Sequence, residues 1–355
     1  MFKIFKFEGC VEIDMKKFLS ILLILSFVIT MTACVERTDN TKTTVVPTAE
    51  VTGSAKTTTA AQVTTPATTQ PTVTTPATTI ATTAKIEFTS AFNPEVVTGR
   101  SNPAAGTYTG YESLPQVQFT VLDPENSRKL ATVATGYGFG LGKNGAQPSQ
   151  SLRNQEHFDK YGALAIDLKS TDKVLHLTFD CGYENGYTGK ILDTLKAKNV
   201  PAAFFCTLPF IKQQPELTTR MIKEGHIVGN HSNTHPVFPN ISREEMAKEV
   251  QTCDNYLRTK FGYTAPYFRF PTGSYSDNSL DLVQSLGFQS VFWSVAYADW
   301  DPAKQKGTQY ALDTVTSRLH PGAVILLHAV SKDNTAALGD IIDWARTQGY
   351  VFSAL

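Results

Sequence analysis

The chain has 355 residues, which is enough for a complete catalytic domain with additional segments. Its 32 basic and 32 acidic residues balance to a formal net charge of zero. Because nucleic-acid-binding domains and membrane-binding patches carry a basic excess, this balance argues against a nucleic-acid partner and against a polybasic membrane surface.

The N-terminus has the pattern of an export signal. Lys16 and Lys17 precede an apolar run over residues 18–31, and small residues follow up to Cys34. A basic start, an apolar stretch and small residues before a cleavage position are typical of a secretory signal, predicted here at 1–34. The end of the stretch resembles a bacterial lipobox, which predicts lipidation of Cys34 and a protein anchored on the outer face of the bacterial cell membrane. An ordinary signal peptide with an incidental cysteine is the alternative.

Residues 35–85 are mostly Thr, Ala, Pro and Val, and the heptad VTTPATT at 63–69 recurs at 73–79. This segment has almost no large apolar side chains whose burial could offset the entropy lost on ordering. We therefore predict a disordered linker that holds a folded domain away from the anchor and across a wall layer.

Residues 86–172 have an intermediate composition. The alternation over 117–121 predicts a strand. We expect this region to be a lead-in segment that packs on the domain after it, and an independent small domain is the alternative.

Residues 173–355 alternate between strand and helix patterns, which predicts an α/β domain with a barrel-like or doubly wound parallel sheet. Ser242 with Glu245 three residues later forms a capping box at the start of one helix. The predicted strands are 174–179, 201–206, 225–230, 267–270, 290–295, 323–328 and 350–353. The predicted helices are 188–198, 215–224, 242–261, 277–286, 309–319 and 335–348.

Polar side chains recur at the ends of these predicted strands, where a parallel barrel places its active site: Asp180, His231, His235, Arg269, Asp299 and His328. His231 and His235 are four positions apart, so a helical turn would put both imidazoles on one face, where they could share a metal ion. His226 lies in an apolar strand and is predicted to be a core histidine.

Five segments resemble, in order, the motifs of the polysaccharide deacetylases, the family 4 carbohydrate esterases with a NodB homology domain: 178–183, 224–235, 269–273, 299–300 and 326–328. The resemblance extends over 173–354 and implies a distorted (β/α) barrel of the NodB type. Three further segments are similar to the delta-lactam-forming peptidoglycan muramic-acid de-N-acetylases: 183–187, 291–296 and 328–334.

The resemblance implies metal-assisted hydrolysis of an N-acetyl group. His231 and His235 would hold a divalent metal ion, expected to be Zn²⁺ with Co²⁺ or Mn²⁺ as alternatives. Asp180 would be the general base that takes a proton from the attacking water. Arg269 would keep Asp180 ionised and oriented through charge pairing.

His328 would be the general acid that protonates the departing sugar amine, and Asp299 would orient it and raise its pKa. A backbone N–H near Thr272 would contribute to the oxyanion hole. Trp300 would form an apolar platform for a sugar face, and Tyr183 is expected to contact the substrate.

The chain departs from the family at Cys181, where an Asp usually supplies a third metal ligand. A Cys181 thiolate could replace that carboxylate. Alternatively, the metal ion could rest on the two histidines and water. Finally, Cys181 could form a disulfide with Cys206, which ends the neighbouring predicted strand.

The sequence therefore predicts an anchored enzyme that deacetylates peptidoglycan, by subgroup resemblance at N-acetylmuramic acid. Deacetylation of another glycan, such as chitin oligomers, peptidoglycan N-acetylglucosamine or acetylxylan, is the alternative within the same class. A glycan-binding lipoprotein with weakened catalysis is the alternative outside it.

Overall fold

The computed structural model describes residues 112–170 and 172–355. The chain divides into two units, Met1–Thr78 and Thr79–Leu355, and all described residues belong to the second. The predicted signal peptide with Cys34, and the linker after it, lie outside the described residues. Among the described residues, no helix combines the length and apolar character needed to span a bilayer.

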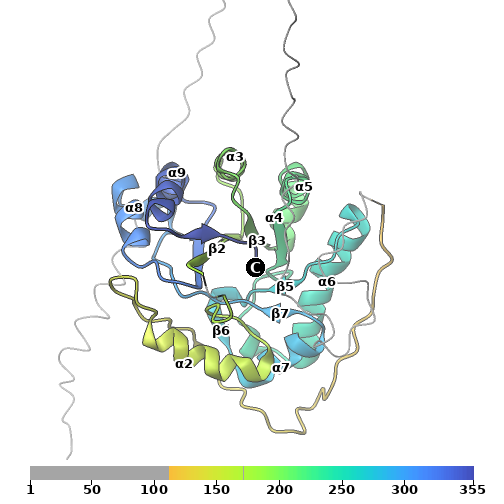
Figure 1. Ribbon diagram of the computed structural model, residues 1–355. Coiled ribbons are helices and arrows are strands. Elements are labelled where there is room, and N and C mark those ends of the chain that lie inside the picture. Colours follow the sequence, from red (N-terminus) through yellow and green to blue (C-terminus); the bar gives the residue numbers. More distant parts are fainter. Residues whose placement is uncertain (1–111, 171) are drawn as a thin grey trace, which may run out of the picture. The chain divides into compact units, whose positions relative to one another are not determined.

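A seven-stranded parallel sheet forms the centre of the second unit (Figure 1). Its strands in spatial order are β7 (Gln289–Ser290), β5 (Tyr267–Phe268), β4 (Ile227–Asn230), β3 (Ala202–Cys206), β2 (Val174–Cys181) and β8 (Ala323–His328), and β9 (Val351–Phe352) also pairs with β2. All eight residues of β2 are buried, as expected for a central parallel strand covered on both faces. The sheet curls into a half-barrel, which confirms the predicted α/β class and distorted (β/α) barrel.

Helices lie outside the curled sheet in Figure 1, and they follow the strands in the predicted alternation. They are α2 (Ser149–Phe158), α3 (Thr188–Lys198), α4 (Leu208–Gln213), α5 (Pro215–Lys223), α6 (Arg243–Phe261), α7 (Asp277–Ser285), α8 (Thr308–Thr316) and α9 (Lys332–Thr347). Single 3₁₀ turns occupy Asp159–Tyr161, Phe238–Asn240, Pro271–Gly273 and Pro302–Lys304, and a two-stranded antiparallel sheet joins β1 (Thr135–Gly136) to β6 (Ser274–Tyr275). The predicted capping box opens α6, with the Ser242 and Glu245 side chains each accepting the other's backbone N–H.

The segment 117–121 is not a strand, contrary to the prediction. Its backbone pairs with amide side chains on α6. The Val117 N–H donates to Asn255 Oδ1 at 2.8 Å, Asn255 Nδ2 donates to the Val117 carbonyl at 2.8 Å, and the Phe119 N–H donates to Gln251 Oε1 at 2.5 Å. Because these side chains satisfy the extended backbone in place of a neighbouring strand, no β-ladder forms.

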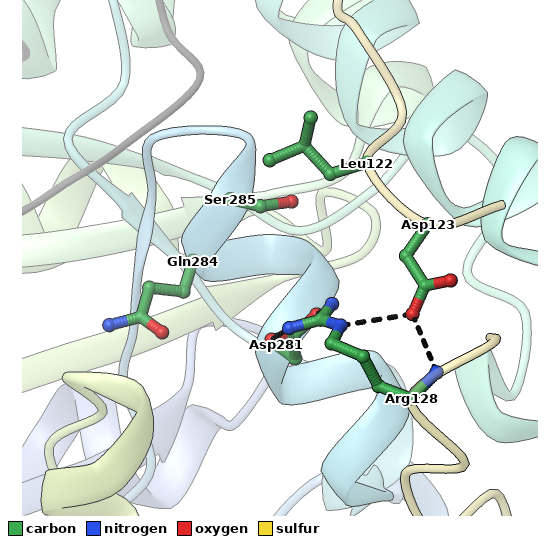
Figure 2. Close-up of a pocket in the computed structure, with 6 residues that line it drawn as sticks. All are labelled: Leu122, Asp123, Arg128, Asp281, Gln284 and Ser285. Carbon is green, nitrogen blue, oxygen red and sulfur yellow. Dashed lines mark hydrogen bonds and ion pairs between the residues drawn. The ribbon is translucent and has the colours of Figure 1, made fainter.

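Ion pairs attach the next part of this segment to α7. Figure 2 shows Arg128 between Asp123, on the same segment, and Asp281 of α7. The Arg128 Nε atom lies 2.9 Å from Asp123 Oδ2, and Nη2 lies 2.5 Å from Asp281 Oδ2. Arg243 of α6 donates from Nε to the Leu122 carbonyl at 3.1 Å and pairs through Nη2 with Asp281 Oδ2 at 2.9 Å, so the lead-in contacts both helices.

Residues just before β2 fill the space between the two ends of the curled sheet. The Leu164 N–H donates to the Ser290 carbonyl at 2.8 Å, and the Phe292 N–H donates to the Leu164 carbonyl at 2.7 Å. The Asp167 N–H donates to the Gly322 carbonyl at 2.9 Å. This close approach requires glycine, because a Cβ at position 322 would stand 1.9 Å from the Asp167 carbonyl oxygen and φ there is +75°. Backbone hydrogen bonds of the lead-in thus bridge the gap between β7 and β8, the two outer strands of the sheet.

Candidate active site

A cavity of about 1000 Å³ opens at the C-terminal ends of the parallel strands. Seven of the predicted site residues line it: Asp180, Tyr183, His231, His235, Thr272, Trp300 and His328. Arg269 and Asp299 are buried directly behind this lining and contact it through hydrogen bonds. Cys181 is absent from the lining, and Cys34 lies outside the described residues.

Asp180 is the next-to-last residue of β2, and its carboxylate lines the cavity. Its Oδ1 accepts a hydrogen bond from Arg269 Nη1 at 2.8 Å, and its Oδ2 lies 3.6 Å from His231 Nε2. Burial raises the pKa of Asp180, but the neighbouring positive charge of Arg269, with smaller contributions from the histidines, outweighs burial and lowers the pKa below its ordinary value. Asp180 is therefore ionised and held in one orientation.

Arg269 is completely buried and is fixed on every side. Its Nε donates to the Val291 carbonyl at 3.0 Å, and Nη2 donates to the Phe292 carbonyl at 3.3 Å. The guanidinium carbon lies 4.0 Å from the centroid of the Phe205 ring. A buried guanidinium is stable only when its nitrogens find hydrogen-bond partners, and here the third nitrogen, Nη1, donates to Asp180.

The two cavity histidines meet although the segment between them is not a helical turn. Residues 231–235 are not helical, and Ser232 and His235 take left-handed backbone angles with φ of 71° and 62°. The Ser232 N–H donates to Asn230 Oδ1, and the His235 N–H donates to Ser232 Oγ, both at 2.9 Å. This turn brings the imidazoles of His231 and His235 to 4.9 Å between centroids. The imidazoles therefore lie close together, as expected for a shared metal ion, through a tight turn in place of a helical one.

The paired imidazoles have the chemistry of metal ligands. His231 Nδ1 lies 2.8 Å from the Arg269 carbonyl, and since a carbonyl only accepts, Nδ1 carries the proton and Nε2 is free to bind a metal ion. Burial lowers the pKa of His231 to about 4 and also lowers the pKa of His235, so both are neutral at pH 7. Among residues 112–170 and 172–355, no three His, Cys, Asp or Glu side chains group as a metal site. The donors fit an open divalent site on two histidines.

Cys181 does not join these histidines. Neighbouring residues of a strand face opposite sides of the sheet, so Asp180 faces the cavity while Cys181 packs, fully buried, in the hydrophobic core. Cys206 is its register partner on β3, and both are free thiols. Burial raises the pKa of the Cys181 thiol well above its ordinary value, which disfavours a thiolate. Cys181 and Cys206 form no disulfide, and the position of Cys181 in the core argues against a thiolate ligand and favours the open two-histidine site.

His328 ends β8, the strand next to β2, where it is the register partner of Asp180, and it pairs with Asp299. His328 Nδ1 lies 2.7 Å from Asp299 Oδ1, and the His328 backbone N–H donates to Oδ2 at 2.8 Å. Burial lowers the pKa of His328, but the hydrogen bond and charge of Asp299, with the charge of Asp180, outweigh burial and raise the pKa above its ordinary value. The pairing thus favours the protonated form of His328, whose imidazole lines the cavity.

Two exposed aromatic side chains flank this chemistry. Trp300 is 58% exposed and Tyr183 is 50% exposed, although both belong to the cavity lining. The Trp300 ring centroid lies 6.0 Å from that of His328. Thr272 has a φ of 57°, an unfavourable conformation for a β-branched residue that is found mainly at functional sites.

Three residues that shape the site were not predicted. Asn334 Nδ2 donates to Asp299 Oδ2, and Tyr297 Oη donates to Asn334 Oδ1 at 2.5 Å. Glu249 of α6 accepts hydrogen bonds from the backbone and hydroxyl of Thr234, at 2.6 and 2.9 Å, and so holds the histidine turn. Asn334 lies within the segment 328–334 that carries the subgroup resemblance, whereas nothing in the local pattern distinguishes Glu249 from any exposed helical glutamate.

The known proteins that resemble this chain are deacetylases and carbohydrate esterases, in agreement with the acid, base and paired histidines of the cavity. Residues 167–291 match the family model for polysaccharide deacetylase. The chain is 40% identical over 220 residues to the peptidoglycan-N-acetylmuramic acid deacetylase PdaA of Bacillus subtilis, which covers 62% of this chain and 83% of that protein. The solved structure of B. subtilis PdaA, a family 4 carbohydrate esterase, matches with a TM-score of 0.60 over 63% of this chain and 95% of that chain. A family 4 carbohydrate esterase from Bacillus anthracis, 38% identical, matches over the same shares with a TM-score of 0.53.

Proposed function

The chain belongs to the family of polysaccharide deacetylases, family 4 carbohydrate esterases that hydrolyse amide bonds of glycans, and on this premise we propose that it removes the N-acetyl group of N-acetylmuramic acid in peptidoglycan. The observation that carries the proposal is that an ionised carboxylate, Asp180, and an imidazole with a raised pKa, His328, line one cavity. Hydrolysis of an amide needs this combination of base and acid, whereas binding of a glycan does not. The 40% identity to PdaA supports the choice of muramic acid.

Asp180 acts as the general base in this proposal. Its low pKa keeps it ionised, and Arg269 fixes its orientation through Oδ1, which leaves Oδ2 available toward the cavity and His231. Asp180 takes the proton of a water molecule as that water attacks the acetamide carbonyl carbon.

His231 and His235 would hold the divalent metal ion that this family typically uses. When bound, such an ion polarises the acetamide carbonyl and lowers the pKa of a bound water. The protein's own contribution is to keep both imidazoles neutral and to orient His231 through the Arg269 carbonyl.

His328 completes the reaction as general acid. It gives its proton to the sugar nitrogen as the carbon–nitrogen bond breaks, and acetate and a free amine leave. Asp299 keeps the imidazole protonated and oriented before this step. A backbone N–H near Thr272 would stabilise the negative oxygen of the intermediate, and Trp300 and Tyr183 would contact the sugar rings.

We further propose that Cys34 is lipidated and that the enzyme works at the outer face of the bacterial cell membrane. The small residues before Cys34 and the apolar run before them support this location. Substitution Cys34→Ala should move the protein from the membrane fraction into the medium, and retention in the membrane fraction would contradict lipid anchoring.

The proposed activity is tested by acetate release from defined glycans. Purified protein is incubated with peptidoglycan strands and with chitin oligomers, and the deacetylated residues are identified by mass spectrometry. We expect free amines on muramic residues, and none with the Asp180→Asn variant. Deacetylation of glucosamine residues alone would contradict the choice of muramic acid and favour the alternative within the class.

A further inference from the structure

Arg318 is a cation in the wall of the catalytic cavity that the proposed chemistry does not use. It follows α8, is half-buried, and lines the cavity that also holds His328. One guanidinium nitrogen, Nη1, donates to the Ala296 carbonyl. Throughout the described part of the chain, no Asp or Glu forms an ion pair with it. Because a guanidinium has five N–H donors, one carbonyl leaves most of its binding capacity unused.

A second cation lies next to this wall. Lys306 Nζ is 4.7 Å from the centroid of the Tyr310 ring and 3.3 Å from its hydroxyl, and Tyr310 lines the same cavity. The Lys306 hydrogen bond lowers the pKa of Tyr310, and the charge of Arg318 contributes in the same direction. This side of the cavity is therefore positive.

The acids near this wall are already engaged elsewhere. Asp299 pairs with His328 and with Asn334, and Asp301 pairs with Lys304 at 3.0 Å. Asp333 Oδ2 accepts the Gly307 N–H at 2.6 Å. The positive charge of Arg318 thus faces a cavity built to admit a ligand, with no protein carboxylate to neutralise it.

We propose that Arg318 binds a carboxylate substituent of the glycan, namely the 3-O-lactyl carboxylate that muramic acid carries and glucosamine lacks. This inference rests on the proposed function and assigns a residue to its specificity. A guanidinium presents parallel N–H groups that match the two oxygens of a carboxylate, and the Ala296 carbonyl fixes the guanidinium from behind. Arg318 is then a specificity residue, distinct from the groups that move protons.

The experiment compares the full-length protein with its Arg318→Gln and Arg318→Lys variants. The substrates are a muramic-acid-containing tetrasaccharide with a free lactyl carboxylate and the same tetrasaccharide with that carboxylate capped as an amide. Lys304→Gln is the matched control, since Lys304 is 82% exposed and outside the cavity lining. Thermal unfolding of each variant shows that it is folded.

For Arg318→Gln we expect KM on the free acid to rise roughly 10- to 100-fold, as for loss of a charged hydrogen bond, with kcat within about twofold of the parent. KM on the amide should be unchanged, and Arg318→Lys should retain part of the preference for the free acid. An equal loss on both substrates, or no loss on either, would overturn the role of Arg318 while leaving the proposed function in place. A parent protein that deacetylates chitin oligomers but neither muramic substrate would overturn the proposed function and this inference together.

Discussion

His328 and Asp299 are joined twice, through the imidazole Nδ1 to Oδ1 at 2.7 Å and through the histidine's own backbone N–H to Oδ2 at 2.8 Å. The second bond fixes the carboxylate relative to the strand end from which the imidazole projects. Ring and carboxylate are therefore oriented as one unit, and the charge of Asp299 acts on His328 at a fixed distance.

This pair predicts the alkaline side of the pH profile. His328 must be protonated to act as an acid, and its raised pKa keeps activity up to a pH above the ordinary histidine value. Asp299→Asn removes the charge that raises this pKa while burial continues to lower it, so the alkaline limb of kcat/KM should move to lower pH. We expect activity to fall by about 100-fold as well. An alkaline limb that stays in place would contradict the assignment of His328 as general acid.

The same pair has a stability consequence with a defined sign. Because the pKa of His328 is raised in the folded state, the pairing stabilises the fold fully below the ordinary histidine pKa and loses this effect as pH rises through the raised value. Urea unfolding should therefore show a larger loss for Asp299→Asn at pH 5 than at pH 9.

Asn334 is predicted to be a positioning residue for this pair. Asn334→Ala removes its bond to Asp299 and should lower kcat by roughly tenfold with little change in KM, because Asn334 is buried and outside the cavity lining. Tyr297→Phe is the matched control, since it removes the other partner of Asn334 and leaves the bond to Asp299. Steady-state kinetics on the muramic substrate measure both, and a larger effect of Tyr297→Phe would argue against this role.

Arg269→Met should leave the Asp180 carboxylate buried without its ion-pair partner and should therefore destabilise the fold. Breaking a buried ion pair costs about 3–5 kcal/mol, and burial would then raise the pKa of Asp180 unopposed by Arg269. The acid limb of kcat/KM should move to higher pH. Arg128→Met, which removes a half-exposed arginine, should cost at most about 1 kcal/mol in the same urea titration. Equal costs for the two variants would contradict the burial argument.

The position of Cys181 in the motif suggests a metal ligand, but its burial in the core predicts that it does not affect metal binding. Cys181→Ala should lose roughly 1–2 kcal/mol of stability through lost packing and leave zinc affinity unchanged. Cys181→Asp should lose several kcal/mol, because it places a carboxylate in the core. Cys253→Ala, another fully buried core cysteine, is the packing control. Isothermal titration calorimetry measures the zinc affinity of each variant. A tenfold loss of zinc affinity in Cys181→Ala would show that the Cys181 thiolate is a metal ligand.

Metal dependence is predicted to rest on the two cavity histidines. Chelation should abolish acetate release, and added Zn²⁺ should restore it. His231→Gln and His235→Gln should weaken zinc binding by more than the roughly 10- to 100-fold that follows loss of an outer-sphere partner. His157→Gln, at a surface ion pair with Asp277, should bind zinc as the parent does. Full activity after complete metal removal would exclude this mechanism.

Local sequence patterns correctly predicted the elements that are stabilised by contacts between residues close together in the sequence. Helix α3 begins and ends at the predicted residues, and the capping box of α6 forms as expected, because both depend on neighbours a few positions apart. The predicted strand over 290–295 shrinks to Gln289–Ser290, since Leu164 supplies the hydrogen bonds of the next residues. That partner is more than 120 positions away, where no local pattern could indicate it.

The candidate site likewise contains residues that the sequence could predict and residues that it could not. The strand-end positions of Asp180, His231 and His328 follow from the alternation of elements, and the structure brings them to one cavity. The twofold alternation of β2 predicts that Cys181 faces away from the cavity that Asp180 lines, whereas the motif resemblance suggested a metal ligand at this position. Arg318 was not predicted as a site residue because it falls in the predicted helix 309–319, where a cation is ordinarily solvated, whereas the helix ends at Thr316.

Leu164 and Asp167 form backbone hydrogen bonds to the two ends of the curled sheet. A fragment expressed as a soluble domain should therefore include both residues. A fragment beginning at Lys173 would keep every motif residue, yet it would leave the backbone groups of Phe292 and Gly322 without these partners. Open strand edges recruit other chains, so such a fragment should aggregate. The unit that folds therefore begins upstream of residue 167, where the family similarity begins.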